Sequence, residues 1–283
     1  MKSINSHLTL ATDAVIDLQM HTTFSDGVWT PEQLIDYLVS EQFGFAAITD
    51  HDRVDTALTL QQLAREKQFP LLTAVEISAS WQGKPTDVLC YGFDPETNDL
   101  HSLTQGIAHR QQENTRHVYE NLQKAGVSFP QHELASLLIK PSAQQPHELL
   151  VLLESLGYTT EEGDAMMTDA GFLWATTDIA AVVDAIHRSG AVCLIAHPGR
   201  GNGYIRYDVD LLDELRARVP IDGLEVYYPD HTPEQVAMYR EYAQTHHLLT
   251  SSGSDSHSPK KMPIKYPAGL SRSLLEHLHI RFE

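Results

Sequence analysis

The sequence is short of cysteine and has no long apolar run. Its 283 residues include two cysteines, Cys90 and Cys193, and each stands inside an apolar stretch. We expect buried thiols rather than a disulfide, which fits a reducing cytoplasm. No apolar run approaches the roughly 20 residues that a membrane-spanning helix needs, and the N-terminus has no basic region followed by an apolar core. The sequence therefore predicts a cytoplasmic protein with no membrane partner.

Positive charge is also scarce. Lysine and arginine number 20 against 38 aspartate and glutamate residues, which gives a formal net charge of −18. Binding along a nucleic-acid backbone depends on lysine and arginine, because these residues displace the counterions of the phosphates. The charge thus argues against a long nucleic acid as a partner. A short anionic substrate is compatible with it, provided that bound metal ions make the local field positive.

Two clusters of potential metal ligands stand where an apolar strand gives way to a polar loop. They are DLQMHTTFSDG at 17–27 and ITDHD at 48–52. Their acidic and imidazole side chains are Asp17, His21, Asp26, Asp50, His51 and Asp52. Turns and caps also favour aspartate, so one cluster alone carries little weight. Two clusters at strand ends predict a metal site, because strand ends hold side chains in a fixed geometry.

The same pattern recurs further along the chain. Glu76 lies near the end of the apolar run 70–78, and the run 191–200 leads to His197. Asp255 and His257 follow a third run through small residues. Uncorrelated surface polarity would rarely place acidic or imidazole groups after so many strands. We therefore expect the functional site at these strand ends.

Strand-like and helix-like segments alternate along most of the chain. Strands are predicted at 15–19, 45–49, 71–77, 87–93, 191–196, 223–228 and 248–253. Helices are predicted at 30–43, 57–67, 178–190, 211–219 and 232–246. The first helix has Thr30 as its N-cap, Pro31 at its first position and Gln33 to complete a capping box. Alternation of this kind, with functional side chains at strand ends, is typical of an α/β barrel.

The alternation stops between about residues 99 and 172, where the pattern is helical and no convincing strand is found. We interpret 99–172 as a helical insertion beside the mouth of a barrel formed by 1–98 and 173–283. Its candidate functional residue is His147, which follows Pro146 at the start of a predicted helix. On its position alone, His147 is more typical of a surface or capping residue.

The motifs in order resemble those of the polymerase and histidinol phosphatase (PHP) family. They are DLQMHTTFSDG, TDHD, Glu76, PHELLVLLESLGY, AHPGR, GLEVYYPDHTPEQ and GSDSH. The resemblance covers nearly the whole chain and is strongest to small stand-alone phosphoesterases, among them nucleoside 3′,5′-bisphosphate phosphatases and 5′-3′ exoribonucleases. It implies a distorted (β/α)7 barrel that holds two or three Mn, Fe or Zn ions, with the helical insertion covering the substrate.

The resemblance also implies a set of metal ligands. His21, Glu76 and Asp255 match ligands of a first ion, and Glu76 bridges to a second. His147 and His197 match ligands of the second ion. Asp26, His51 and His257 match those of a third.

The sequence departs from the family pattern at two positions. The family motif begins H-x-H, but Gln19 stands in place of the first histidine, and Asp87 stands where a histidine is common. A neutral amide is a far poorer ligand than imidazole, so we expect the first ion to bind weakly. Four of the proposed ligands, Asp26, Glu76, Asp87 and Asp255, are carboxylates, and together they would neutralise the charge of two divalent ions. Binding of a phosphate substrate would then be favoured by further positive charge, from a third ion or from Arg200. We expect Arg200 and Gln19 to contact the substrate and Asp87 to be a metal ligand.

The predicted function is that of a metal-dependent phosphoesterase acting on a small, nucleotide-like substrate through a metal-activated water. His257 or His231 would protonate the leaving group, with Arg200 assisting. No G-x-S-x-G motif is present, so a covalent nucleophile is not expected. Two alternatives stay open, a metal-dependent hydrolase of another ester or amide, resembling an amidohydrolase, and a non-catalytic metal-binding module. The sequence leaves the oligomeric state open.

Overall fold

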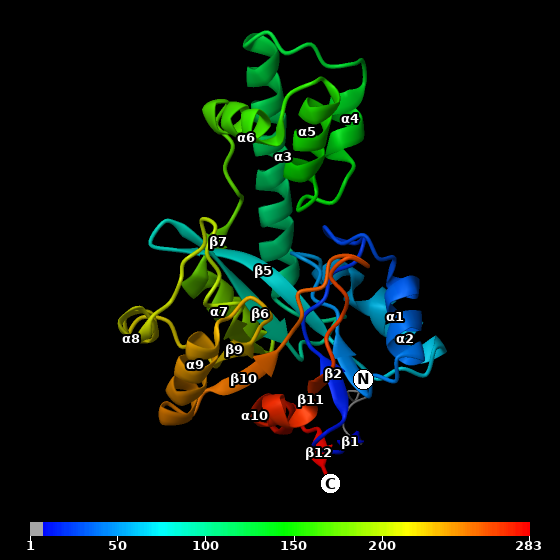
Figure 1. Ribbon diagram of the computed structural model, residues 1–283, viewed down its shortest axis with the longest axis vertical. Helices are drawn as coiled ribbons and strands as arrows, with labels where there is room; N and C mark the ends of the chain where they lie inside the picture. The colour runs from blue at the N-terminus through cyan, green and yellow to red at the C-terminus, as the bar shows by residue number, and fades with distance from the viewer. Residues whose placement is uncertain (1–7) are drawn as a thin grey trace.

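The computed structural model describes residues 8–283, and its strands form a mixed α/β fold (Figure 1). The largest sheet has the order β10-β9-β8-β6-β5-β7. These strands are β5 (Ala74–Trp81), β6 (Lys84–Tyr91), β7 (Thr177–Asp178), β8 (Val192–Ile195), β9 (Gly223–Tyr227) and β10 (Leu249–Ser252). Neighbours pair in parallel except that β6 is antiparallel to both β5 and β8. The β5–β6 hairpin corresponds to the two consecutive strands predicted at 71–77 and 87–93.

A second sheet has the order β11-β2-β3-β4. It consists of β2 (Val15–Asp17), β3 (Phe45–Ala47), β4 (Leu71–Leu72) and β11 (Tyr266–Pro267). β1 (Thr9–Leu10) pairs with β12 (Arg281–Phe282) near the two ends of the described chain. The parallel-rich α/β fold predicted from the sequence is confirmed. A closed barrel is not, because the paired strands form separate sheets.

Several backbone hydrogen bonds connect the segments that follow the strands of the two large sheets, on both sides. Leu18 donates its N–H to the carbonyl of Ser252 at 3.1 Å, just beyond β2 and at the end of β10. On the other side, Glu76 donates its N–H to the carbonyl of Thr49 at 3.1 Å. The loops that follow β2, β3 and β10 therefore converge on β5.

Helices cover the outer faces of the sheets. They are α1 (Pro31–Ser40), α2 (Ala57–Glu66), α7 (Ile179–Arg188), α8 (Val209–Arg216), α9 (Pro233–Thr245) and α10 (Arg272–His277), with 3-10 turns η2 (Val54–Thr56) and η3 (Ala268–Ser271). The capping box of α1 is present as predicted, since Thr30 and Gln33 exchange side-chain to backbone bonds. Thr232 and Gln235 repeat it at α9. These caps fix where each helix begins after a strand-end loop.

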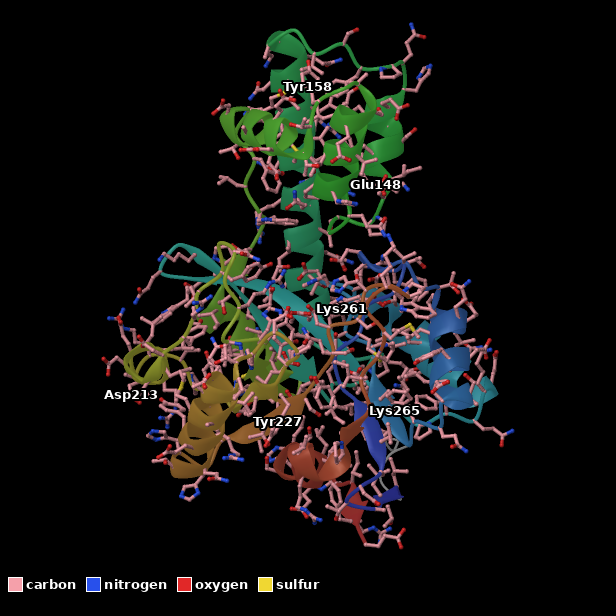
Figure 2. The ribbon with its side chains drawn as sticks, in the orientation of Figure 1. Glu148, Tyr158, Asp213, Tyr227, Lys261 and Lys265 are labelled. Atoms are coloured by element: carbon pink, nitrogen blue, oxygen red, sulfur yellow. The ribbon has the colours of Figure 1, made fainter. Side chains whose placement is uncertain are left out.

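The segment predicted to be helical forms four helices that project from the sheets (Figure 1). They are α3 (Leu100–Lys124), α4 (Glu133–Leu138), α5 (Gln145–Ser155) and α6 (Thr160–Asp169). The far end of α3 packs with α5 and α6 around an apolar cluster that includes Val118, Leu149 and Leu153. The near end of α3 instead places Leu100 and Ile107 in the core of the large sheet. Figure 2 shows Glu148 and Tyr158 on this helical body, away from Tyr227 and Lys265 on the sheets.

The core beneath the site is apolar and tightly enclosed. All four residues of β8 are buried, as are both cysteines, whose thiols are free. Cys90 on β6 lies directly opposite Cys193 on β8. Burial raises the pKa of both thiols well above the usual value, which makes them poor nucleophiles. No helix among the described residues is long and apolar enough to cross a bilayer.

Candidate metal centre

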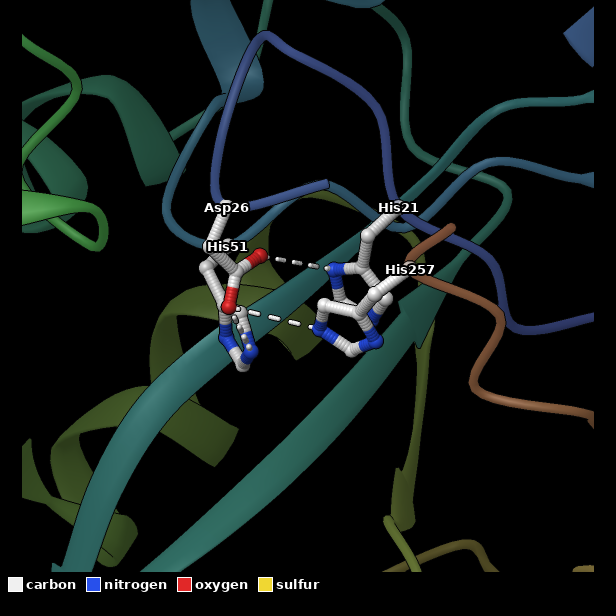
Figure 3. Close-up of side chains that lie close together, drawn as sticks. All are labelled: His21, Asp26, His51 and His257. Carbon is white, nitrogen blue, oxygen red and sulfur yellow. Dashed lines mark ion pairs between the residues drawn. The ribbon is translucent and has the colours of Figure 1, made fainter. Parts of the chain in front are cut away.

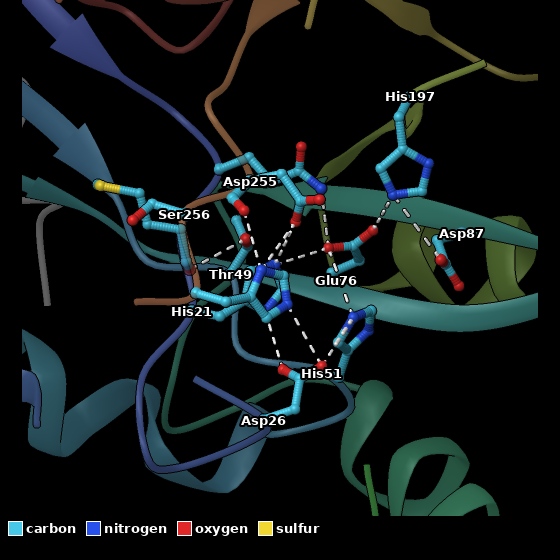
Figure 4. Close-up of polar contacts among 12 residues, drawn as sticks. His21, Asp26, Thr49, His51, Glu76, Asp87, His197, Asp255 and Ser256 are labelled. Atoms are coloured by element: carbon cyan, nitrogen blue, oxygen red, sulfur yellow. Dashed lines mark hydrogen bonds and ion pairs between the residues drawn. The ribbon is translucent and has the colours of Figure 1, made fainter. Parts of the chain in front are cut away.

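Glu76 lies at the middle of a cluster of buried imidazoles and carboxylates (Figure 4). Its Oε1 lies 3.0 Å from Nε2 of His197, and its Oε2 lies 3.1 Å from Nε2 of His21. Nε2 of His21 is also 3.2 Å from Oδ1 of Asp255. The two oxygens of one carboxylate therefore face two different sets of ligands, as they do when a carboxylate bridges two metal ions.

Three overlapping groups of side chains could each hold a metal ion, since their ligand atoms lie within 4.8 Å of one another. The groups are His21 with Glu76 and Asp255, His51 with Glu76 and Asp87, and His21 with Asp26, His51 and His257. Figure 3 shows the third group, in which Asp26 faces His21 and His257. The rings of His21 and His257 stack with centroids 4.1 Å apart. The structure thus brings together eight of the predicted ligands, counting His197 beside Glu76.

The residues present fit divalent cations. Both ring nitrogens of His21, Nδ1 of His51 and Oδ2 of Asp87 are buried without a hydrogen-bond partner among the described residues. Buried polar atoms are seldom left unpaired in folded proteins, and ligation is one way to satisfy them. Imidazole and carboxylate donors suit Mn, Fe and Zn. The donor set therefore supports a metal centre without identifying the ion.

The charges of the cluster are strongly coupled. Burial by itself lowers the pKa of His21, but the adjacent carboxylates of Asp255 and Glu76 outweigh it and raise the pKa well above the usual value. Burial raises the pKa of Glu76, but His51, His197 and His21 outweigh it and hold the pKa well below its usual range. The Glu76 carboxylate would be ionised and so ready to bind a cation. A bound cation would in turn displace protons from the imidazoles.

Asp87 departs from the strand-end pattern but lies within the cluster. It stands in the middle of β6, opposite Ser78, and its Oδ2 is 3.8 Å from Nε2 of His197. Burial and the negative charge of Glu76 raise the pKa of Asp87 to about 6. Glu76 likewise lies near the beginning of β5, not at a strand end, because β5 continues to Trp81 in the hairpin.

Gln19 is completely buried and does not face a cavity. Its side-chain amide donates a hydrogen bond to Oε2 of Glu76 at 2.9 Å. The side chain is 0% exposed, so this geometry does not favour the contact between Gln19 and the substrate, which stays a prediction. Gln19 is buried because it lies between β2 and the loop that follows, where its side chain points into the protein toward Glu76.

His147 lies away from the cluster. It is exposed on α5, whose buried side carries Leu149 and Leu153, and it belongs to no candidate ligand group in residues 8–283. The structure therefore does not place it as a ligand of a second ion. Packing of α5 into the helical body directs the ring to solvent.

Some acidic residues of the motifs hold loops and do not face the metal groups. Asp50 accepts hydrogen bonds from the backbone N–H of Thr22 at 2.6 Å, from the Thr22 hydroxyl at 2.7 Å and from the Ser25 hydroxyl at 2.8 Å. Asp52 accepts one from the N–H of Ser78 at 3.0 Å. Asp50 thereby fixes the loop that carries Asp26. The sequence alone did not separate these supports from ligands.

Sequence reasoning missed Glu225. This residue of β9 is completely buried, and its Oε2 accepts the backbone N–H of His197 at 2.8 Å. Burial raises the pKa of Glu225 well above its usual value. The bond holds His197 in a left-handed conformation with φ of 28°. The available signal was an acidic residue at an inward position of the apolar strand GLEVY.

His231 has neither ring nitrogen free. Its Nε2 accepts the backbone N–H of Gly199 at 3.0 Å, and its Nδ1 lies 3.0 Å from the carbonyl of Val226, to which it donates. This geometry argues against the predicted proton-donor role. His231 instead holds the loop that carries Arg200 against β9.

Two cavities flank the cluster. One, of about 210 Å³, lies between the cluster and the near end of the helical body, where α3 contributes Ile107 and Gln111. The other, of about 730 Å³, is lined by the loop after β8 and by Lys261 on the loop after β10 (Figure 2). Arg200 and His257 line both cavities. Nη1 of Arg200 lies 3.5 Å from Nε2 of His197, so the guanidinium stands directly beside the centre.

Comparison with known proteins gives the chain clear relatives. No family model matches it. It is 28% identical over 251 residues to a 5'-3' exoribonuclease of Haemophilus influenzae, covering 86% of this chain and 90% of the relative. It is 26% identical over 273 residues to a 3',5'-nucleoside bisphosphate phosphatase of Chromobacterium violaceum, covering 87% and 88%.

The fold is also found among solved structures. A protein from Bifidobacterium adolescentis named as a metal-dependent phosphoesterase superposes with a TM-score of 0.76 at 24% identity, covering 92% of this chain and 94% of the other. That likeness concerns the fold. The ligand motifs and the curated relatives agree with the resemblance of this chain to the PHP family of metal-dependent phosphoesterases.

Proposed function

We propose that this protein hydrolyses a phosphate ester of a small, nucleotide-like substrate at the centre around Glu76. The observation that carries the proposal is the position of Glu76, whose two oxygens face His197 on one side and His21 on the other. The curated relatives support it, because they are an exoribonuclease and a nucleoside bisphosphate phosphatase.

The three overlapping ligand groups would hold two or three divalent ions, of Mn, Fe or Zn. When bound, such ions supply an activated water and neutralise charge on the phosphoryl oxygens. We expect the group formed by His21, Glu76 and Asp255 to bind its ion most weakly, because the neighbouring Gln19 offers an amide in place of an imidazole ligand. The group of His51, Glu76 and Asp87 offers the same donors, one imidazole and two carboxylates, without that amide as a neighbour.

Two side chains are placed to act on the substrate. Arg200 stands beside His197 and borders both cavities, so its guanidinium can bind phosphate oxygens in pairs. His257 borders the same two cavities, and its Nδ1 donates to the carbonyl of Asp255 at 2.9 Å. When the group of His21, Asp26, His51 and His257 holds no ion, that bond leaves Nε2, 3.3 Å from Asp26, as the nitrogen that would deliver a proton to the leaving oxygen.

We also infer the arrangement of the barrel and its insertion. The bonds of Leu18 to Ser252, after β2, and of Glu76 to Thr49, after β3, support a distorted (β/α)7 barrel made of 1–98 and 173–283, of which 1–7 lie outside the described residues, with 99–172 as the insertion. The insertion forms one wall of the smaller cavity. A narrow cavity and a net charge of −18 favour a nucleoside bisphosphate or a very short oligonucleotide over a long strand.

Metal analysis and phosphate release would test the proposal on the same preparation. Metal per chain would be measured by elemental analysis, and phosphate release from a nucleoside 3′,5′-bisphosphate, a nucleoside monophosphate and a long single-stranded RNA. We expect bound metal and fastest release from the bisphosphate. Bound metal without phosphate release would instead indicate a hydrolase of another ester or amide, and absence of metal would indicate a non-catalytic module.

A further inference from the structure

Trp174 is a half-exposed tryptophan beside the metal centre. Its side chain is 49% exposed, whereas Trp81 is 5% exposed in the core. Trp174 lines the smaller cavity together with Asp26, His51 and His257. Large apolar side chains exposed within a cavity that also holds convergent polar groups mark a ligand site. Folding alone therefore does not explain the position of Trp174.

The backbone on both sides of Trp174 is held in place by α3. The N–H of Leu173 donates to Oδ1 of Asn114 at 3.1 Å, and the N–H of Ala175 donates to Oε1 of Gln111 at 3.0 Å. Both acceptors come from the same helix, and Gln111 is itself buried. The indole is thus presented by a rigid support, although it stands in a segment without regular structure. Rigid aromatic groups bind with a smaller entropic cost than mobile ones.

The two cavities beside the metal centre differ in character. The smaller one carries apolar side chains of the helical insertion and its return segment, namely Ile107, Ala143, Trp174 and Ala175. The larger one carries Arg206 and Lys261 and no comparable aromatic group from the insertion. A molecule with one flat apolar end and one anionic end fits this division, with its reacting phosphate between the two cavities.

We propose that Trp174 is the stacking platform for the nucleobase of the substrate and determines specificity for nucleotides over phosphate esters without a base. The inference rests on the proposed function, because it takes the ligand at the metal centre to be a phosphate ester. Stacking on an aromatic side chain is tolerant of base identity, since each base has a flat π face. Trp174 would therefore select for a base without selecting which base.

Calorimetric binding to the metal-loaded protein would test this without relying on turnover. The ligands are a hydrolysis-resistant phosphonate analogue of AMP and the matching ribose phosphonate without a base. We expect Trp174→Ala to weaken binding of the AMP analogue on the order of 10-fold, and to leave the ribose phosphonate unaffected. Trp174→Phe should restore most of the lost affinity, because phenylalanine keeps a ring that can stack.

Leu173→Ala is the matched control, because Leu173 is 71% exposed on the same segment but does not line the cavity at the metal centre. It should bind both ligands as the unaltered protein does. If Trp174→Ala weakens the binding of both ligands equally, or of neither, then Trp174 is not a stacking platform for the base. The same follows if the unaltered protein binds both analogues equally well. Failure of the proposed function would look different, because the metal-loaded unaltered protein would then release no phosphate and would bind neither phosphonate.

Discussion

The side-chain amide of Gln19 donates a hydrogen bond to Oε2 of Glu76 at 2.9 Å, and both residues are completely buried. In the family pattern an imidazole stands at the position of Gln19. Here the position no longer contributes a strong ligand but still orients the carboxylate at the middle of the cluster. The same oxygen of Glu76 must then serve both Gln19 and the group around His21.

The first prediction is that Gln19→His increases the number of metal ions bound per chain. Imidazole is a stronger ligand than an amide oxygen for Mn, Fe or Zn, so the site built on His21 should fill. Elemental analysis after gel filtration would measure it, with the exposed Gln62→His as a control that should leave the metal content unchanged. An unaltered protein that already carries three ions at full occupancy would contradict the argument.

The second prediction concerns the carboxylate at the centre. Glu76→Ala should reduce phosphate release on the order of 1000-fold, because metal ions contribute several kcal/mol to the transition state. His197→Ala should cost less, since it removes one terminal ligand. Thermal unfolding should still show a cooperative transition in both variants. Glu234→Ala, at a fully exposed position of α9, should be active. Near-normal turnover by Glu76→Ala would place the metal centre elsewhere.

The third prediction separates a loop support from a proton donor. His231→Ala leaves the buried N–H of Gly199 and the carbonyl of Val226 unpaired, so it should destabilise the protein by about 1–3 kcal/mol. Displacement of the loop should also move Arg200 away from the substrate phosphate, and KM should therefore rise. The pH dependence of kcat should stay as it is, which a pH–rate profile would check. If His231→Ala removes one limb of the pH–rate profile and His257→Ala does not, then His231 is the proton donor.

The fourth prediction concerns Arg200→Lys. A guanidinium holds phosphate oxygens two at a time, whereas an ammonium offers a single point of charge. The variant should therefore discriminate less between a nucleoside bisphosphate and its monophosphate, with the metal content unchanged. Measured ratios of kcat/KM for the two substrates would decide it. Arg206→Lys is the comparison, because Arg206 borders the larger cavity only. If Arg206→Lys alone lowers the ratio, the second phosphate binds there and not at Arg200.

The sequence by itself determined which segments carry the ligands. Local rules sufficed for the α1 capping box at Thr30 and Gln33, because a cap depends on residues three apart. They also sufficed to place His21 and Asp255 after strands, where the polar motif follows the apolar run in the chain. The helical content of 99–172 followed from periodicity alone.

The tertiary structure alone decided what each of these side chains does. Asp26 and Asp50 stand in similar motifs, but Asp50 is a loop support because its partner Thr22 lies 28 residues away and reaches it only in the folded chain. His147 follows Pro146 as the motif requires, yet packing of α5 turns it to solvent. Trp174 lines the cavity at the candidate metal centre, where Asn114 and Gln111 of α3 accept hydrogen bonds from the backbone on either side of it. Long-range contacts select among side chains that are equivalent in the sequence, because burial and hydrogen-bond partners belong to the fold and not to the local pattern.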